Sequence, residues 1–103
     1  MDRMDQLKAF LQKEPENSFL MHALALEYLK IEKFDEARFL FEQILLRDPG
    51  YIGSYYHLAK LLERLGQVDL AIQWYEKGMT EANKAHDLHT YSELESALED
   101  LRP

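Results

Sequence analysis

Two histidines near the C-terminus, His86 and His89, come closest to the spacing of a metal site. Imidazole nitrogens bind Zn²⁺ and Ni²⁺, and two side chains three residues apart share a face of a continuous helix. No third ligand is evident, and a polar helix junction explains the pair as well. We therefore predict no metal ligand, and a metal-binding protein or enzyme is kept as an alternative.

A second pair, Ser54 and His57, has the residue types of a nucleophile and its base. Such chemistry also needs an orienting acid and an oxyanion pocket, which stacked helices do not readily supply. The sequence contains neither a Gly-rich phosphate loop nor a His-Glu-x-x-His motif. We therefore predict a non-catalytic protein with no catalytic residue and no cofactor.

The charge balance narrows the class of partner. Twelve Lys and Arg residues against nineteen Asp and Glu give a net charge of −7, whereas nucleic acids and anionic membranes are bound by clustered positive charge. The chain has no cysteine, and no apolar run approaches the roughly 18 residues that span a bilayer. Acidic residues near the N-terminus do not suit a signal peptide. We expect a cytoplasmic protein that binds neither nucleic acid nor membrane.

The sequence repeats itself with a period of 34 residues. The coinciding positions are small or apolar residues at helical spacing, which is typical of stacked helix pairs rather than of chance identity. A generic helical bundle with a fortuitous period is the alternative. The identical pairs are Pro15 and Pro49, Leu24 and Leu58, Ala25 and Ala59, Asp35 and Asp69, Ala37 and Ala71, and Glu42 and Glu76.

Amphipathic periodicity predicts two helices in each repeat. Gly66 is suited to a positive φ between the second pair, and Glu32 holds the same place in the first. Gly78 lies inside a predicted helix, where close packing explains it better than flexibility. Asp87 or Thr90 begins the last helix, since Thr90-x-x-Glu93 has the form of a capping box. The predicted helices cover residues 5–13, 18–31, 34–47, 52–65, 68–85 and a terminal segment.

These positions resemble the tetratricopeptide repeat, whose signature is Trp-x2-Leu-Gly-x2-Tyr, Ala-x3-Phe and Pro. The first repeat matches it as Met21-x2-Leu24-Ala25-x2-Tyr28, Ala37-x3-Phe41 and Pro49. The resemblance implies an all-α fold, a short right-handed helical solenoid of antiparallel helix pairs with about six helices. The whole chain, 1–103, would form one domain. Its parts would be a half-repeat at 4–14, repeats at 18–51 and 52–85, and a capping helix at 87–102.

In this family the first helix of each repeat lines a concave groove. Carried over by position, the resemblance implies that the chain binds a peptide or partner helix of unknown identity there. Alternatively, Phe19 and Leu26 pack against the half-repeat helix or a second copy, which would make the chain a homo-oligomerising scaffold. The partner-binding residues implied are Phe19, His22, Leu26 and Lys30, then Gly53, Tyr56, Lys60 and Glu63, with His57 and Arg64 at the edges.

Overall fold

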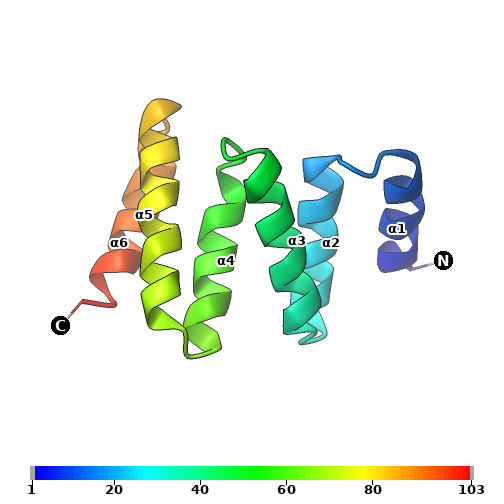
Figure 1. The fold of residues 1–103 in the computed structure, drawn as a ribbon, viewed down its shortest axis with the longest axis horizontal. Coiled ribbons are helices and arrows are strands. Elements are labelled where there is room, and N and C mark those ends of the chain that lie inside the picture. The colour runs from blue at the N-terminus through cyan, green and yellow to red at the C-terminus, as the bar shows by residue number, and fades with distance from the viewer. Residues whose placement is uncertain (1, 103) are drawn as a thin grey trace. The chain divides into compact units, whose positions relative to one another are not determined.

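The chain folds into helices throughout, as its periodicity predicts (Figure 1). The computed structural model describes residues 2–102, and over this range it contains six α-helices and no strand. The predicted bounds are confirmed closely; the largest difference is at α6, which ends at Glu99 rather than at residue 102. Residues 1 and 103 of the predicted domain lie outside the described residues. The helices are α1 (Arg3–Lys13), α2 (Ser18–Lys30), α3 (Phe34–Arg47), α4 (Gly53–Arg64), α5 (Val68–Lys84) and α6 (Leu88–Glu99).

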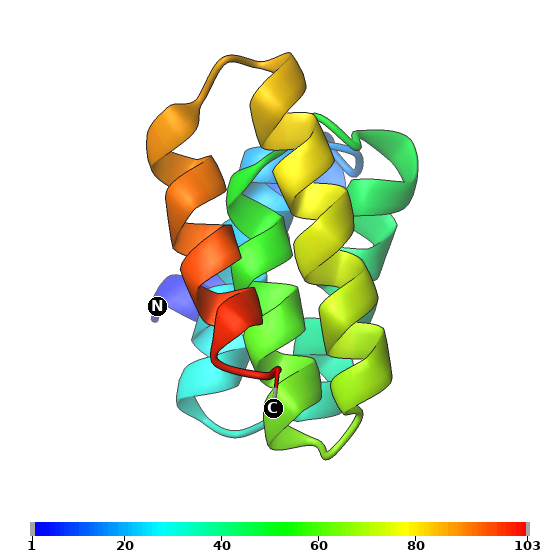
Figure 2. The same cartoon turned by 90° about the vertical axis from the view of Figure 1, so that its left-hand side faces the viewer.

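The helices group into two compact units, Met1–Asp48 and Pro49–Pro103. In the first unit α2 packs against both α1 and α3, and in the second α5 packs against both α4 and α6. Figure 2 shows α5 and α6 running antiparallel and joined by a short turn. Each unit therefore has a central helix that is covered by two neighbours.

Small and large side chains alternate in the core of the N-terminal unit. Ala25 of α2 and Ala37 of α3 are fully buried, and a methyl side chain lets two helix axes approach closely. Phe41 is also fully buried, and Leu7 of α1 joins Leu24 in one hydrophobic cluster. The predicted half-repeat helix thus contributes to the core of this unit.

The C-terminal unit repeats the plan with Ala59 and Ala71, both fully buried. Tyr75 of α5 is the largest fully buried side chain. Gly78, one turn further along α5, is buried against Tyr55 of α4 and Leu94 of α6. The absence of a Cβ at this position lets three helices meet, as the sequence predicts.

The α2–α3, α4–α5 and α5–α6 turns each contain a residue with positive φ. Gly66 has φ 79°, as expected, and Glu32 and His86 take φ 58° and φ 57° at equivalent places. The next backbone N–H returns to the helix at each turn; for example, Gln67 N donates to the Leu62 carbonyl over 2.8 Å. These bonds form Schellman motifs, which satisfy carbonyls at the helix end. His86 therefore belongs to a turn and not to a continuous helix.

Asp87 begins α6, and of the two N-caps considered only this one is confirmed. Its Oδ1 accepts from Thr90 N over 3.0 Å, and its Oδ2 accepts from Thr90 Oγ1 over 2.8 Å. The capping box predicted from Thr90 is wrong because Thr90 is already the third residue of the helix and donates to the cap. The Asp87 carboxylate thus satisfies an N–H that the helix itself leaves unpaired.

We expect Asp87→Ala to destabilise α6 and Asp87→Asn to preserve it at neutral pH. The hydrogen bonds from Thr90, first the backbone N–H and then the hydroxyl, lower the pKa of Asp87 below its ordinary value. A lowered pKa contributes stability that is present above the ordinary pKa and is lost as pH falls through the folded value. Urea unfolding followed from about pH 6 to about pH 3 checks this. If the free energy of unfolding falls with pH as steeply in Asp87→Asn as in the wild type, the Asp87 carboxylate is not the source of the pH dependence.

Candidate functional site

The predicted binding residues of the N-terminal unit form a stripe along α2. Asn17 caps this helix by accepting from Leu20 N over 3.0 Å. Phe19 leaves 65% of its surface exposed, so α1 does not cover it, contrary to one alternative. His22 and Leu26 are half-buried. The stripe therefore contains one exposed aromatic side chain, Phe19, and two half-buried side chains, His22 and Leu26.

Two members of this stripe have defined partners. The His22 ring meets Phe41 edge-on, with 5.6 Å between the ring centroids. Lys30 is exposed, and its Nζ lies 2.8 Å from Glu27 Oε2. His22 is thus anchored to the core, while the Lys30 ammonium lies at the surface in an ion pair worth little to stability.

The predicted binding residues of the C-terminal unit form a connected group on α4. Lys60 Nζ lies 5.7 Å from the Tyr56 ring centroid and 3.5 Å from Glu63 Oε2. The Tyr75 hydroxyl of α5 donates to the same Glu63 oxygen. Glu63 is therefore tied to the core of its unit, and its carboxylate holds Lys60 beside Tyr56.

The remaining α4 positions surround this group. Gly53 is exposed at the first residue of the helix, and Arg64 is exposed at its end. His57 is half-buried, with its ring 6.0 Å from that of Tyr56. Burial lowers the pKa of His57 below its ordinary value of 6.5. The imidazole is therefore neutral at neutral pH, where it can act as both donor and acceptor.

The structure does not support a nucleophile at Ser54 or a metal site at His86 and His89. Ser54 is fully buried, so a substrate does not reach its hydroxyl. His86 lies in the α5–α6 turn, while His89 lies on α6 with its Nε2 2.9 Å from Glu93 Oε1. The premise that both imidazoles share a continuous helix is therefore wrong. Across residues 2–102, the side chains of His, Asp and Glu form no group of three that could hold a metal ion.

None of the helices between residues 2 and 102 combines the length and the apolar character needed to cross a membrane.

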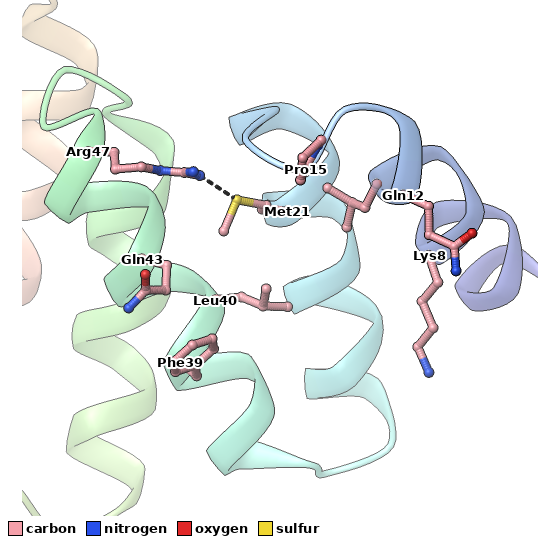
Figure 3. A pocket seen from close by; sticks show the side chains of 9 residues that line it. Lys8, Gln12, Pro15, Met21, Phe39, Leu40, Gln43 and Arg47 are labelled. Carbon is pink, nitrogen blue, oxygen red and sulfur yellow. Dashed lines mark hydrogen bonds between the residues drawn. The ribbon is translucent and has the colours of Figure 1, made fainter.

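One surface feature of the N-terminal unit escapes the sequence prediction. Phe39 of α3 is 60% exposed and lines a cleft of about 420 Å³ beside α1 (Figure 3). Phe39 lies off the apolar stripe that Ala37, Phe41 and Ile44 form on this helix, so the sequence-based prediction assigns it no role. The spacing of Phe39, Gln43 and Arg47, four residues apart on one helix face, is the signal that could have found it.

Together, the paired helices and their repeated small positions define an all-α helical repeat protein. The sequence profile of the Tetratricopeptide repeat matches residues 28–90. A tetratricopeptide repeat domain protein from Salinibacter ruber, solved by NMR, is 41% identical with a TM-score of 0.82, covering 85% of this chain and 89% of that one. The chain belongs to the tetratricopeptide repeat family.

Two further structures share the fold. A crystal structure of a tetratricopeptide repeat domain protein from Salinibacter ruber is 40% identical with a TM-score of 0.79, covering 82% of this chain and 94% of that one. The solution structure of a Bordetella parapertussis protein is 29% identical with a TM-score of 0.83, covering 98% of this chain and 88% of that one. No curated protein matches the chain. Domains of this family generally mediate protein–protein interaction and are generally non-catalytic.

Proposed function

We propose that the chain is a non-catalytic interaction module that binds a peptide or a partner helix. The residues proposed to bind the partner lie on α2 in the N-terminal unit and on α4 in the C-terminal unit, the first helices of the two repeats. A cytoplasmic location and the absence of nucleic-acid and membrane partners remain predictions of the sequence.

The observation that carries the proposal is the exposure of Phe19. A phenylalanine that is 65% exposed leaves a large apolar area in water, and an aromatic side chain is a common anchor of binding energy at protein interfaces. Its helix neighbours toward the core, Met21 and Leu24, are buried. Phe19 is therefore not needed to hold α2 in place and is available to a partner.

The α4 group supports the same function by a different route. The Tyr75 hydroxyl holds the Glu63 carboxylate, which in turn holds Lys60 over the Tyr56 ring. A binding surface that is already ordered loses less side-chain entropy when a partner arrives. Lys60 would pair with an acidic group of the partner while Tyr56 supplies apolar contact.

The Phe19→Ala and Tyr56→Ala double variant is expected to lose partner capture by about tenfold or more. Affinity capture from an extract of the source organism, quantified for each recovered protein, measures this. The melting temperature should change little for Phe19→Ala alone, because that side chain is exposed. Phe10→Ala is the matched control, since Phe10 is 55% exposed on α1 and lies outside both stripes.

Two outcomes would contradict the proposal. If the double variant captures the same proteins as the wild type, the α2 and α4 surfaces are not the binding site. If light scattering shows a concentration-dependent dimer that Phe19→Ala dissociates, the alternative of a homo-oligomerising scaffold is correct.

A further inference from the structure

A cleft in the N-terminal unit lies apart from the α2 stripe just described. It is flanked by α1 and α3, floored by α2, and has a volume of about 420 Å³ (Figure 3). This volume falls in the range of roughly 300–1,000 Å³ that is typical of small ligand sites. None of the predicted binding residues lines it. Its apolar wall consists of Leu11, Pro15, Met21, Phe39 and Leu40.

Phe39 is the exposed aromatic side chain of this wall. It leaves 60% of its surface exposed, and together with Leu40 it also lines an adjoining cleft of about 320 Å³. Met21 is buried, and its Sδ accepts from the Arg47 guanidinium over 2.9 Å. The cleft thus has a fixed floor and one open aromatic wall, which suits the insertion of a large apolar side chain.

The polar residues at the cleft carry only positive charge or none. They are Lys8 and Gln12 on α1 and Gln43 and Arg47 on α3. In the part of the chain that the structure describes, no carboxylate lines the cleft, although acids outnumber bases by nineteen to twelve overall. Asp35 and Glu36 line the adjoining cleft, so the positive character belongs to the side bounded by Lys8 and Arg47, where it favours a ligand with negative charge.

Both cations are held at the cleft by contacts that a ligand can share or exchange. Lys8 Nζ lies 5.7 Å from the Tyr28 ring centroid, which leaves its N–H donors available for a carboxylate. Arg47 pairs with Glu16 over 3.3 Å, and the Glu16 side chain is 78% exposed. An exposed pair of this kind contributes little, so a ligand carboxylate can replace Glu16 without cost to the fold.

We propose that the cleft binds an acidic peptide segment that carries a large apolar side chain. The apolar side chain packs on Phe39 over Met21 and Leu40, and flanking carboxylates pair with Lys8 and Arg47. Gln12 lies on the α1 side of the cleft and Gln43 on the α3 side (Figure 3), and a glutamine amide can both donate to and accept from a peptide main chain. A peptide fits better than a second folded copy because the cleft holds only a few side chains.

The test is fluorescence anisotropy with two labelled synthetic peptides. Both contain a central Leu-Phe pair, which is flanked by glutamates in one peptide and by lysines in the other. We expect the glutamate peptide to bind at least about tenfold more tightly, and its affinity to fall as salt screens the charges. Phe39→Ala should weaken binding by about tenfold or more.

Charge reversal makes the test specific. The Lys8→Glu and Arg47→Glu double variant should prefer the lysine peptide. If loss of the Arg47 contacts prevents the double variant from folding, Lys8→Glu alone can be tested instead. It should reduce the preference for the glutamate peptide over the lysine peptide. Phe10→Ala is the control, since Phe10 is exposed and does not line the cleft. Phe19→Ala is measured as well, because it reports whether the peptide binds the α2 stripe instead.

Several results would overturn the proposal. These are absence of binding by the glutamate peptide, equal affinity for both peptides, and full binding by Phe39→Ala. If Phe19→Ala loses binding and Phe39→Ala retains it, the peptide binds the α2 stripe and not the cleft. A dimer that light scattering detects and Phe39→Ala dissociates would make a second copy the occupant.

Discussion

Replacing Gly78 by alanine will destabilise the protein, although alanine is the better helix former. A Cβ built at Gly78 would lie 2.7 Å from Tyr55 Cβ and 2.9 Å from Leu94 Cδ1. Leu94 Cδ1 is the end of a flexible side chain, but Tyr55 Cβ is fixed to the α4 backbone and cannot swing away. Relief therefore requires α4 and α5 to separate, which disturbs the core of the C-terminal unit.

Two opposing terms set the size of this effect. Alanine gains about 1 kcal/mol of helix propensity over glycine, while overpacking a core costs about 1–3 kcal/mol. Because the closest contact is to a Cβ that cannot move away, we expect a cost in the upper part of this range, which leaves a net loss of up to about 2 kcal/mol, or a fall in Tm of up to roughly 15 °C. Thermal unfolding followed by circular dichroism measures it.

Thr80→Ala provides the matched control for this experiment. Thr80 is exposed on the same helix, two residues from Gly78. Its replacement gains helix propensity and loses only an exposed hydrogen bond from its hydroxyl to the Glu76 carbonyl, so Tm should change little. A Gly78→Ala variant that behaves like Thr80→Ala would show that the three helices can accept a methyl group.

The same contacts explain why the helices could be predicted from the sequence so closely. Ala25, Ala37, Ala59 and Ala71 are fully buried, and their recurrence reflects a steric requirement that only small residues meet. Gly66 was predictable for a similar reason, because its φ of 79° excludes most side chains. Steric requirements of this kind act on residue type and therefore leave a trace in the sequence.

Features that depend on contacts between particular side chains were harder to predict from the sequence. Asp87 and Thr90 are both acceptable N-caps by type, and only the path of the turn at His86 selects Asp87. Periodicity places Phe39 off the buried stripe of α3, but the cleft beside it depends on the gap between α1 and α3. Periodicity within one helix does not contain information about that gap.

Glu63 shows how this limit affects the candidate site. By position it was predicted to contact a partner, whereas its carboxylate accepts from the buried Tyr75 hydroxyl and pairs with Lys60. Glutamate and tyrosine are twelve residues apart, on different helices, and their contact requires the packing of α4 on α5. Glu63 therefore positions its neighbours, and the proposed contacts to a partner fall to Tyr56 and Lys60.

Tyr75→Phe is expected to destabilise the protein by about 1.5–3 kcal/mol, the range for a hydrogen bond to a charged group. The phenylalanine ring fills the same fully buried space, so only the hydroxyl is lost. Tyr75→Ala also leaves a cavity and should cost about 3–5 kcal/mol, a large part of the stability of a small domain. Urea unfolding of the two variants separates the hydroxyl from the ring.

The pH dependence provides an independent check on this contact. Burial first, and then the bond to Glu63, raises the pKa of Tyr75 far above its ordinary value of 10. A raised pKa contributes stability that is complete below the ordinary value and is lost as pH rises through it toward the folded value. The wild type should therefore lose stability above about pH 10, and Tyr75→Phe should lose less.

Glu63→Gln tests the role of the Glu63 charge and leaves the Tyr75 ring in place. Glutamine keeps an acceptor for the Tyr75 hydroxyl but removes the charge that holds Lys60 at 3.5 Å and opposes ionisation of the phenol. We expect a small loss of stability, earlier ionisation of one phenol in an absorbance titration, and weaker partner capture as Lys60 leaves the edge of Tyr56. If partner capture survives both Glu63→Gln and Tyr75→Phe, the ordering of Lys60 does not contribute to binding. An absorbance titration in which all phenols ionise together near their ordinary pKa, with the helices intact, would show that Tyr75 is not buried against Glu63.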